Sequence, residues 1–363
     1  MKILILTNNF SGLHSFRKEV VKSLCDGGHE VTISAPFDAN KQYFEEIGCQ
    51  IIDTSFNRKG VNPFEDLVLM LRYMLLLRRL KPDVVLSYTI KPNVYGGMAC
   101  QWYGIPQMAN ITGLGSAVEH PGWLQKLTVI LYKIGLRKTN IVFFQNKASM
   151  GFFQQHGMVK GGQVLLPGSG VNLKHHVLQD YPNPDYPLRF IFVGRLMREK
   201  GVDEYLIAAE HIKSKYPDVE FHILGSCEER YEERLKILQN NYIVIYHGTQ
   251  LDVRPYIGRC HCTVHPSFYP EGMSNVLLES CATGRPIITT DRPGCGEIVE
   301  DGINGFVVKQ RDANDLIDKI EMFIRLPYEK KREMGLAARR KVEREFDRNI
   351  VVKAYLDSIN SLM

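Results

Sequence analysis

Short apolar runs alternate with longer helical segments along the whole chain, and this alternation limits the possible folds more than any other feature. In the first half the runs are KILILT (2–7), EVTISAP (30–36), CQIIDTSF (49–56), DVVLSYT (83–89) and NIVFFQN (140–146). In the second half they are LRFIFVG (188–194), VEFHILG (219–225), NYIVIYHG (241–248), CTVHPSF (262–268), RPIITT (285–290) and NGFVV (304–308). Strands that are separated by helices predict parallel sheets with right-handed crossovers. The sequence therefore predicts an α/β protein with one parallel sheet in each half.

The length of 363 residues suggests about two domains. Prolines at 182, 184 and 187 and polar flanks interrupt the alternation, so we expect a linker at 168–187 between domains at 1–167 and 188–345, with a separate helix at 346–363. No run of about 18 uncharged apolar residues occurs, so no membrane-spanning helix is expected. The eight cysteines lack the spacing of a disulfide framework and there is no export signal, which favours the cytoplasm.

The net charge of +5 is unevenly distributed along the chain. Residues 1–165 hold 18 Lys and Arg against 11 Asp and Glu (+7), whereas residues 166–363 hold 27 against 29 (−2). Within 58–160 the counts are 13 and 4 (+9). A basic first half predicts a polyanion or an anionic membrane surface as partner. The alternative is a set of charges scattered over a solvated surface.

Two helical segments of the first half resemble helices that lie in a membrane interface. Residues 122–140 carry Trp123 on an apolar stripe, with a basic stripe of Lys126, Lys133 and Arg137 beside it. Residues 62–83 are also strongly apolar and carry several arginines. Interfacial helices combine such an apolar face with Lys and Arg at its edges. For both segments, the alternative is a domain helix whose apolar side is buried.

The segment 266–288, PSFYPEGMSNVLLESCATGRPII, has the pattern of a strand, a loop and a helix. Gly272 and Ser274 carry little side chain, so N–H groups of the loop can approach an anion, and the following helix adds its dipole. Glu271 lies on the loop and Glu279 in the helix. Carboxylates hold paired hydroxyls such as those of ribose. A diphosphate flanked by two diols, as in a nucleotide sugar, fits this arrangement.

A second constellation, FIFVGRLMREKGVDEYL (190–206), places Arg195 and Lys200 after a buried strand that ends at Gly194. Strand carboxyl ends face the ligand crevice in open α/β sheets. Two cations there neutralise a diphosphate leaving group without a metal ion. Taken alone, an Arg and a Lys in a loop are more often solvated charges, but the phosphate loop favours the functional interpretation.

These segments, together with PGCGEIVEDGINGFVV (293–308), resemble the family 4 retaining glycosyltransferases over nearly the whole chain. The resemblance implies a GT-B fold, in which two Rossmann-like domains face each other across a cleft and the last helix packs back on the first domain. It implies that Arg195 and Lys200 bind the diphosphate and that Glu271 contacts the donor sugar, these three being the catalytic positions. It also implies that Glu279 holds the ribose and that HGTQLDV (247–253) cradles the base. The other implied donor-binding residues are Gly194, Gly248, Thr249, Gly272, Met273, Ser274, Asn275 and Val276.

The segments NNFSGLHSFRKEVVKSL (8–24) and YTIKPNVYGGMACQWYGIPQMANITGLGS (88–116) resemble bacterial enzymes that extend undecaprenyl-diphosphate-linked glycans, including the type that adds N-acetylgalactosamine to lipid-linked diacetylbacillosamine. The acceptor-binding residues expected from these segments are Gly12, His14, Arg17, Lys91, Asn110 and Thr112. For His14 and Arg17 the alternative is the ordinary polarity of a helix start. Many members of the family place a His near the donor sugar at the position of residues 110–115, where this chain has NITGLG. Asn110 and Thr112 can hydrogen-bond a sugar but cannot act as a base.

The resemblance thus implies transfer of a hexose or N-acetylhexosamine, with retention, from a UDP-sugar to a polyprenyl-diphosphate-linked saccharide. The basic first half favours the cytoplasmic face of an anionic membrane as the place of transfer. No metal ion is expected, because CHCTVH (260–265) is typical of a strand and has no second ligand pair at zinc spacing. No cofactor is expected either, since GLGS (113–116) lacks the third Gly of a dinucleotide-binding motif, and no nucleic-acid partner is expected. Front-side and covalent routes both remain open. So do two other functions, a non-hydrolysing UDP-sugar 2-epimerase and a non-catalytic nucleotide-sugar-binding protein.

Overall fold

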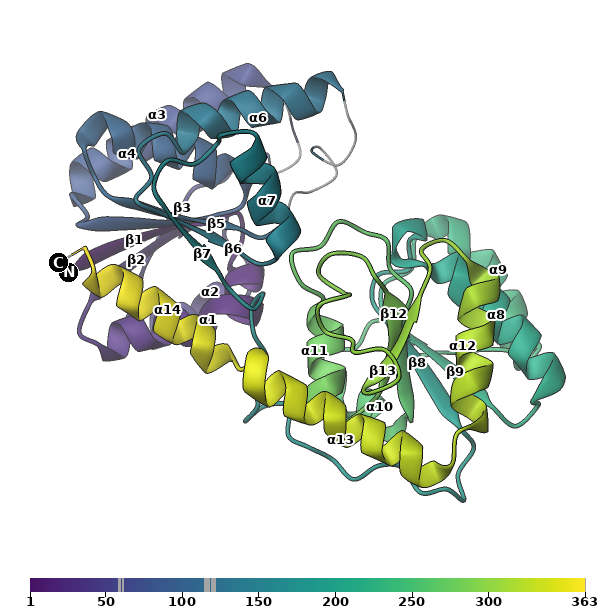
Figure 1. The fold of residues 1–363 in the computed structure, drawn as a ribbon. Coiled ribbons are helices and arrows are strands. Elements are labelled where there is room, and N and C mark those ends of the chain that lie inside the picture. Colours follow the sequence, from purple (N-terminus) through teal and green to yellow (C-terminus); the bar gives the residue numbers. More distant parts are fainter. Residues whose placement is uncertain (58–59, 61, 114–117, 119–121, 363) are drawn as a thin grey trace. The chain divides into compact units, whose positions relative to one another are not determined.

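The computed structural model describes residues 1–57, 60, 62–113, 118 and 122–362. Contacts between residues divide the chain into two compact units, each built around a parallel sheet (Figure 1). The first unit comprises Met1–Gly170 and Arg348–Met363, and the second unit comprises Val171–Asp347. The end of the chain therefore belongs to the same unit as its beginning.

Within the described residues, the first unit contains a seven-stranded parallel sheet in the order β3-β2-β1-β4-β5-β6-β7. Its strands are β1 (Lys2–Leu6), β2 (Glu30–Ala35), β3 (Gln50–Asp53), β4 (Val84–Tyr88), β5 (Gln107–Ile111), β6 (Ile141–Phe144) and β7 (Gly162–Leu165). Its helices are α1 (Phe10–Asp26), α2 (Lys41–Glu46), α3 (Pro63–Leu80), the π-helix η1 (Pro92–Gly96), α4 (Gly97–Tyr103), α6 (Trp123–Gly135), α7 (Lys147–Gln155) and α14 (Arg348–Asn360).

Helices cover both faces of this sheet (Figure 1). Ile3 and Ile5 of β1 pack in the cluster formed with α1, α2 and α14, whereas Leu4 and Leu6 pack with α3 and α4. Successive side chains of a strand point to opposite faces, so a strand covered on both faces must be apolar at consecutive positions. This requirement explains the continuous apolar runs of the sequence.

The second unit contains, within the described residues, a six-stranded parallel sheet in the order β10-β9-β8-β11-β12-β13. Its strands are β8 (Arg189–Val193), β9 (Glu220–Leu224), β10 (Ile245–Tyr246), β11 (Cys262–His265), β12 (Ile287–Thr290) and β13 (Gly305–Val308). Its helices are the 3₁₀ turn η2 (Arg198–Lys200), α8 (Val202–Lys215), α9 (Glu229–Asn240), α10 (Arg254–Arg259), α11 (Asn275–Ala282), α12 (Ala313–Arg325) and α13 (Tyr328–Glu345).

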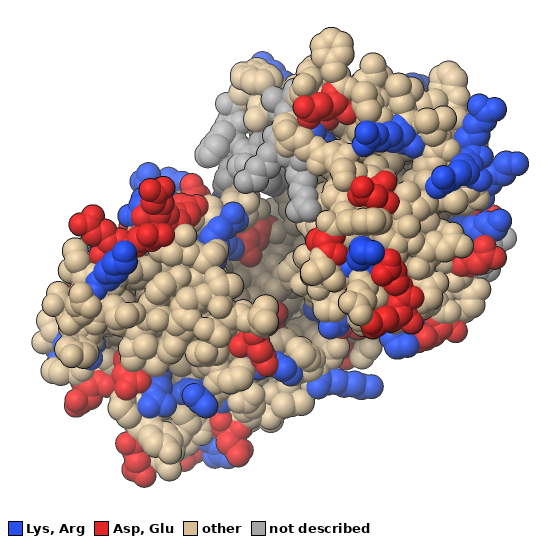
Figure 2. Space-filling model, turned by 180° about the vertical axis from the view of Figure 1, so that it is seen from behind, with Lys and Arg blue, Asp and Glu red and all other residues tan. Residues whose placement is uncertain are grey.

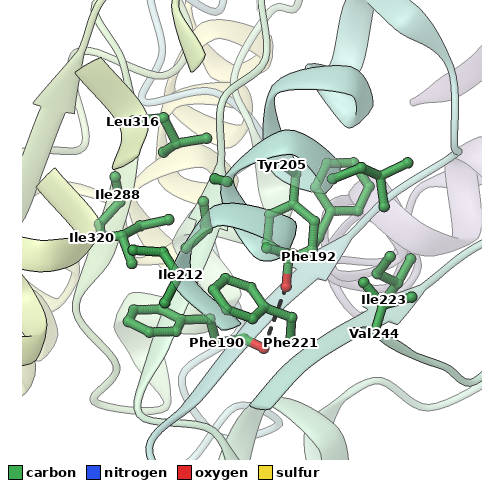
Figure 3. Packing of buried hydrophobic residues seen from close by; sticks show 14 of the residues in the cluster. Phe190, Phe192, Tyr205, Ile212, Phe221, Ile223, Val244, Ile288, Leu316 and Ile320 are labelled. Atoms are coloured by element: carbon green, nitrogen blue, oxygen red, sulfur yellow. Dashed lines mark hydrogen bonds between the residues drawn. The ribbon is translucent and has the colours of Figure 1, made fainter. Parts of the chain in front are cut away.

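Aromatic side chains form much of the core between this sheet and helices α8, α9 and α12 (Figure 3). Phe190 stacks on Phe221 with ring centroids 5.4 Å apart. Tyr205 is fully buried, and its hydroxyl donates to the carbonyl of His222 at 2.9 Å. A buried Tyr needs such a partner for its O–H. The core therefore fixes β8, the strand that precedes Arg195.

The predicted α/β class with two parallel sheets is confirmed. Two strands were not predicted: β5 (QMANI) contains buried Gln and Asn, and β7 (GQVL) is short and only half-buried. The run 241–248 yields only the two-residue strand β10, because Tyr242 adopts a left-handed φ of 58° and turns the chain. The predicted helix 122–140 is too long, since α6 ends at Gly135 and Arg137 lies beyond it.

The surface gives two results about charge and hydropathy. On the face shown in Figure 2, Lys and Arg side chains are interspersed with Asp and Glu. None of the helices within the described residues combines the length and hydropathy that crossing a bilayer requires.

Candidate functional site

The two predicted donor-binding loops flank the point where the strand order of the second unit reverses. From β8 the sheet continues through β9 and β10 on one side, and from β11 through β12 and β13 on the other. Open α/β sheets bind ligands outside the strand carboxyl ends at such a point. The loops 194–201 and 266–274 follow β8 and β11, and Phe268 N donates to Glu199 O at 2.9 Å. The structure therefore brings the two sequence motifs into direct contact.

The loop after β8 requires glycine at its end. Gly201 adopts φ 75°, and a Cβ there would lie 2.2 Å from the carbonyl oxygen of Pro266. No other residue fits this conformation and this space. Gly194, which begins the loop, has φ 155°. Arg195 is exposed and Lys200 is half-buried, so the loop presents a guanidinium to solvent and holds an ammonium against its neighbour.

Lys200 is ion-paired with Glu271, and both side chains are largely buried. His265, the last residue of β11, places Nε2 3.6 Å from Glu271 Oε1. Burial alone would raise the pKa of Glu271, but the contact with His265 and the charge of Lys200 lower it to about 2. Complete burial lowers the pKa of His265, which keeps its ring neutral near pH 7. Glu271 is therefore ionised throughout the physiological pH range.

The first turn of α11 lacks its usual cap. Ser274 occupies the N-cap position, yet its side chain makes no capping hydrogen bond. Within the described residues neither Ser274 Oγ nor Asn275 Oδ1 has a hydrogen-bond partner, although both atoms are buried. A Ser cap normally satisfies one of the unpaired N–H groups of the first turn. Without it, these N–H groups and the helix dipole are available to an anion.

Two residues behind this loop hold its backbone. Ser274 N donates to Gly294 O at 2.8 Å, and Gly294 N donates to Glu297 Oε2 at 2.7 Å. Gly294 adopts φ 91°, and a Cβ there would lie 3.0 Å from Gly272 O. Glu297 therefore supports the backbone of the predicted phosphate-binding loop (266–274) through Gly294. Met273 is another predicted donor-binding residue, and its side chain packs in the apolar core beneath α11.

The remaining predicted donor residues lie on two other elements. After β10, Gly248 adopts φ 68° and its carbonyl accepts from Gly225 N at 2.9 Å, while Thr249 is exposed. On α11, Val276 is half-buried at the edge of the apolar core. Glu279 Oε1 lies 3.9 Å from His176 Nε2. The segment before β8 thus places an imidazole beside the carboxylate predicted to hold the ribose.

In the first unit the strand order reverses between β1 and β4, and α1 follows β1. The side chain of Asn9 caps α1 by accepting from Gly12 N. A Cβ on Gly12 would lie 2.6 Å from Asn9 Oδ1, so a larger residue there would require the Asn9 side chain to shift. His14 packs edge-on against Tyr43 with centroids 4.9 Å apart. Burial, and then the charge of Lys18, lower the pKa of His14.

The loop after β4 is strained and tied to α3. Thr89 adopts φ 72°, a region that β-branched residues rarely occupy, and η1 is a π-helix, a feature frequent at functional sites. Lys91 Nζ lies 2.7 Å from Asp66 Oδ1, and the Tyr95 hydroxyl donates to Asp66 Oδ2 at 2.7 Å. Because Asp66 lies in the first turn of α3, its carboxylate joins that helix to the predicted acceptor loop.

Two predicted acceptor residues lie inside the first unit. Arg17 is 3% exposed and Asn110 is 1% exposed. Asn110 Nδ2 donates to the hydroxyl of Tyr355, which comes from α14, at 2.5 Å. Thr112, by contrast, is exposed after β5. The structure therefore separates Thr112 from the buried pair, whereas Arg17 and Asn110 share Tyr355 as a neighbour.

Helices α3, α4 and α6 present large apolar side chains to solvent, and we call this surface the apolar helix face. Phe64 is 80% exposed, Trp102 75% and Trp123 70%. The face also includes Leu67, Val68, Leu71, Leu75, Tyr103, Leu127, Ile130 and Ile134. The three helices lie on one side of the sheet, and α4 contacts both α3 and α6 (Figure 1). Lys126, Lys133 and Arg137 are exposed as well. These apolar side chains are therefore not buried against the first unit.

Sequence reasoning missed His265, Glu297, His176, Asp66 and Tyr355. His265 and Glu297 lie within quoted motifs, so their position beside the phosphate loop was a usable signal. The sequence holds no such signal for His176 or Tyr355, because each contacts a partner that is distant along the chain. Tyr355, for example, contacts Asn110 at a separation of 245 residues.

Both halves of the chain match known families. Residues 2–146 match the family described as "Glycosyl transferase 4-like", and residues 177–341 match "Glycosyl transferases group 1". The chain is 27% identical to the N,N'-diacetylbacillosaminyl-diphospho-undecaprenol alpha-1,3-N-acetylgalactosaminyltransferase of Campylobacter jejuni, over 98% of this chain and 97% of that relative. It is also 27% identical to the capsular polysaccharide biosynthesis glycosyltransferase CapM of Staphylococcus aureus, over 86% of this chain and 84% of CapM.

Solved structures show the same fold. Anabaena HepE in complex with UDP matches with a TM-score of 0.80 and 19% identity, over 99% of this chain and all of that chain (100%). Sucrose-phosphate synthase from Thermosynechococcus elongatus matches with a TM-score of 0.79 and 17% identity, over 100% of this chain and 99% of that chain. The predicted GT-B fold is thereby confirmed. With a 4-like domain in its first half and a group 1 domain in its second, the chain matches glycosyltransferase families over both of its halves.

Proposed function

We propose that this glycosyltransferase moves a hexose or N-acetylhexosamine from a UDP-sugar to a polyprenyl-diphosphate-linked saccharide, with retention. The contact between the loops after β8 and β11 carries the proposal, because Lys200 meets Glu271 just before the uncapped start of α11. The names of the relatives support the substrates: the C. jejuni enzyme is named for a diphospho-undecaprenol-linked acceptor, and HepE was crystallised with UDP.

The donor diphosphate binds where the charges of the second unit favour an anion. Its oxygens accept from the first-turn N–H groups of α11 and from Arg195 and Lys200. The ionised Glu271 accepts hydrogen bonds from donor-sugar hydroxyls, and Glu279 accepts them from the ribose. Gly248 and Thr249 meet the base through their backbone.

Transfer breaks the bond between the anomeric carbon and the β-phosphate oxygen, and the electron pair leaves with UDP. The acceptor oxygen bonds to the anomeric carbon, and its proton passes to the leaving phosphate oxygen. Arg195, Lys200 and the helix start stabilise the charge that develops on UDP. Glu271 is held by its ion pair with Lys200, so in this proposal it orients the sugar, and the acceptor attacks from the face that UDP leaves.

The acceptor binds in the first unit, at the carboxyl ends of β1 and β4, with its lipid in an anionic membrane at the cytoplasmic side. The apolar helix face and its flanking Lys126, Lys133 and Arg137 have the composition of a surface that rests in the headgroup region. This placement gives the first unit access to a lipid-linked substrate.

Transfer assays with a panel of UDP-sugars and a short polyprenyl-diphosphate-linked acceptor test the proposal. We expect Lys200→Ala and Glu271→Ala to abolish transfer, whereas Lys236→Ala, an exposed residue of α9, leaves it unchanged. In a second experiment the enzyme is incubated with the UDP-sugar donor and no acceptor. Formation of an epimer of the donor sugar, or donor binding without transfer to any acceptor, contradicts the proposal.

A further inference from the structure

We propose that Arg17, Tyr88, Asn110 and Tyr355 form a binding site for a sugar phosphate inside the first unit, at the sugar–diphosphate junction of the acceptor. This inference rests on the proposed function and adds to it two residues, Tyr88 and Tyr355, and the chemical group that they recognise. The four residues come from α1, β4, β5 and α14.

The first observation is a buried charge without a counter-charge. Arg17 is 3% exposed, and its Nη1 donates to the carbonyl of Phe16 at 2.8 Å. Its Nε and Nη2 have no hydrogen-bond partner, and no carboxylate pairs with it among the residues that the structure describes. An unpaired guanidinium in the interior is strongly unfavourable. A bound anion supplies the missing counter-charge.

The second observation is that other unsatisfied polar atoms surround the same place. Tyr88 OH and Asn110 Oδ1 are buried and have no hydrogen-bond partner within the described residues. Tyr355 connects the set: its ring centroid lies 5.9 Å from the Arg17 guanidinium carbon and 6.4 Å from the Tyr88 ring centroid, and its hydroxyl accepts from Asn110. Native interiors leave few polar groups unpaired, so four such atoms around one tyrosine indicate a ligand.

Topology places the set on the ligand side of the sheet. Tyr88 is the last residue of β4, and it pairs in register with Asn110, the penultimate residue of β5. Side chains of a helix lean toward its N-terminus, so Arg17 leans toward the end of α1 that follows β1. Tyr88 and Asn110 thus lie at the carboxyl edge, next to the strained Thr89, and the other two residues contact them from the helices. This edge is where open parallel sheets bind ligands.

The mixture of donors and acceptors selects the ligand. Arg17 Nε and Nη2 and the Tyr88 hydroxyl donate, which suits phosphate oxygens. Asn110 Oδ1 only accepts, so a second phosphate oxygen there would be unfavourable, whereas a hydroxyl would satisfy it. The ligand therefore carries a phosphate next to a hydroxyl, as a glycosyl phosphate does.

Thermal unfolding of the full-length protein tests the site, with saturating UDP present so that the donor site is occupied. N-acetylgalactosamine 1-phosphate should raise the unfolding temperature of the wild-type protein more than inorganic phosphate does at equal concentration. Arg17→Gln should weaken this protection about tenfold or more, because a hydrogen bond to a charged group is lost. Lys18→Gln, on the same helix, is the matched control and should leave it unchanged. Equal protection by the two probes, or equal protection of Arg17→Gln and wild type, overturns the proposal.

Tyr355→Phe provides a second, milder variant, because it removes one hydroxyl and keeps the aromatic packing with Phe143 (centroids 4.3 Å apart). It should raise the KM for the lipid-linked acceptor by about threefold to tenfold at unchanged donor KM, as expected for one neutral hydrogen bond. An unchanged acceptor KM contradicts the site. UDP should protect both variants as it protects the wild type; failure of UDP to protect the wild-type protein would instead contradict the proposed donor function.

Discussion

Lys200 and Glu271 form an ion pair that joins the loop after β8 to the loop after β11. Because both side chains are largely buried, removing one charge leaves the other unpaired. Lys200→Met and Glu271→Leu should each lower the free energy of unfolding by about 3 kcal/mol, and the double variant should lose much less than the sum. Urea denaturation measures the cycle. All three proteins should lack transfer activity, so additive stability losses would contradict the coupling without affecting the assignment of function.

The uncapped first turn of α11 predicts opposite effects on stability and on donor binding. Asp is as good an N-cap as Ser and complements the helix dipole, so Ser274→Asp should keep or raise the unfolding temperature without ligand. Its charge would repel the diphosphate, and UDP affinity should fall by about tenfold or more. Calorimetric titration with UDP measures this loss. Ser274→Ala is the control, and equal UDP affinity in the Asp and Ala variants would contradict an anion site there.

Glu297 should influence the donor only through Gly294. Glu297→Ala removes the acceptor for Gly294 N and should raise the donor KM about tenfold, since the backbone at Ser274 loses its support. Glu297→Gln keeps an oxygen that can accept this hydrogen bond and should restore most of the affinity. A direct charge contact with the donor would make the Gln variant as defective as the Ala variant.

The apolar helix face should bind anionic membranes. Lys126→Glu, Lys133→Glu and Arg137→Glu combined should reduce binding to phosphatidylglycerol vesicles by roughly a hundredfold, because each basic residue near the surface contributes about 1 kcal/mol. Sedimentation with vesicles measures the partitioning. The matched control reverses three exposed charges of the second unit, Lys236, Lys330 and Arg340. If both triple variants bind equally well, the first unit is not the membrane-binding one.

His261 should make stability depend on pH. It is 2% exposed and accepts from Arg189 N at 3.1 Å; burial first, then the charges of Arg189 and Arg285, lower its pKa from 6.5 to about 4. The unfolded chain therefore binds the proton more readily between these values. This contribution is complete above pH 6.5 and is lost as the pH falls toward 4, about 2–3 kcal/mol in all.

Urea denaturation at pH 7 and pH 5 tests this dependence with His261→Gln, whose side-chain oxygen can still accept from Arg189 N. The variant should be less sensitive to pH over this range than the wild type. His211→Gln, at an exposed position, is the control. An unchanged pH dependence in His261→Gln would show that other groups cause it.

The fold was largely predictable because burial on both faces of a parallel sheet leaves continuous apolar runs in the sequence. Strand β5, one of the two strands that were not predicted, shows the limit of this signal. Its Gln107 is buried because Nε2 donates to Ser87 Oγ and Oε1 accepts from Thr139 Oγ1, and Asn110 is buried against Tyr355. Such polar residues break the apolar pattern, and only the folded chain supplies their partners.

The donor site was predictable where its residues follow one another along the chain, as in 271–279. Positions whose role depends on a partner distant in the sequence were not predictable. Asp66 looked like an ordinary acidic residue in the first turn of a helix, and only the structure shows Lys91 and Tyr95 on its two oxygens. Met273 lies within the 271–279 motif, but its side chain packs in the apolar core beneath α11.

The first unit is assembled from the two ends of the chain. Val351, Tyr355 and Ile359 of α14 lie in the same apolar cluster as Ile3 and Ile5 of β1, and Arg348 pairs with Glu19. Until the last helix is made, the part of the sheet face that α14 covers stays exposed, although α1 and α2 already pack on the same face. A fragment that stops at Gly170 would therefore lack part of its own interior, and the first unit can be produced alone only if Arg348–Met363 is joined to it.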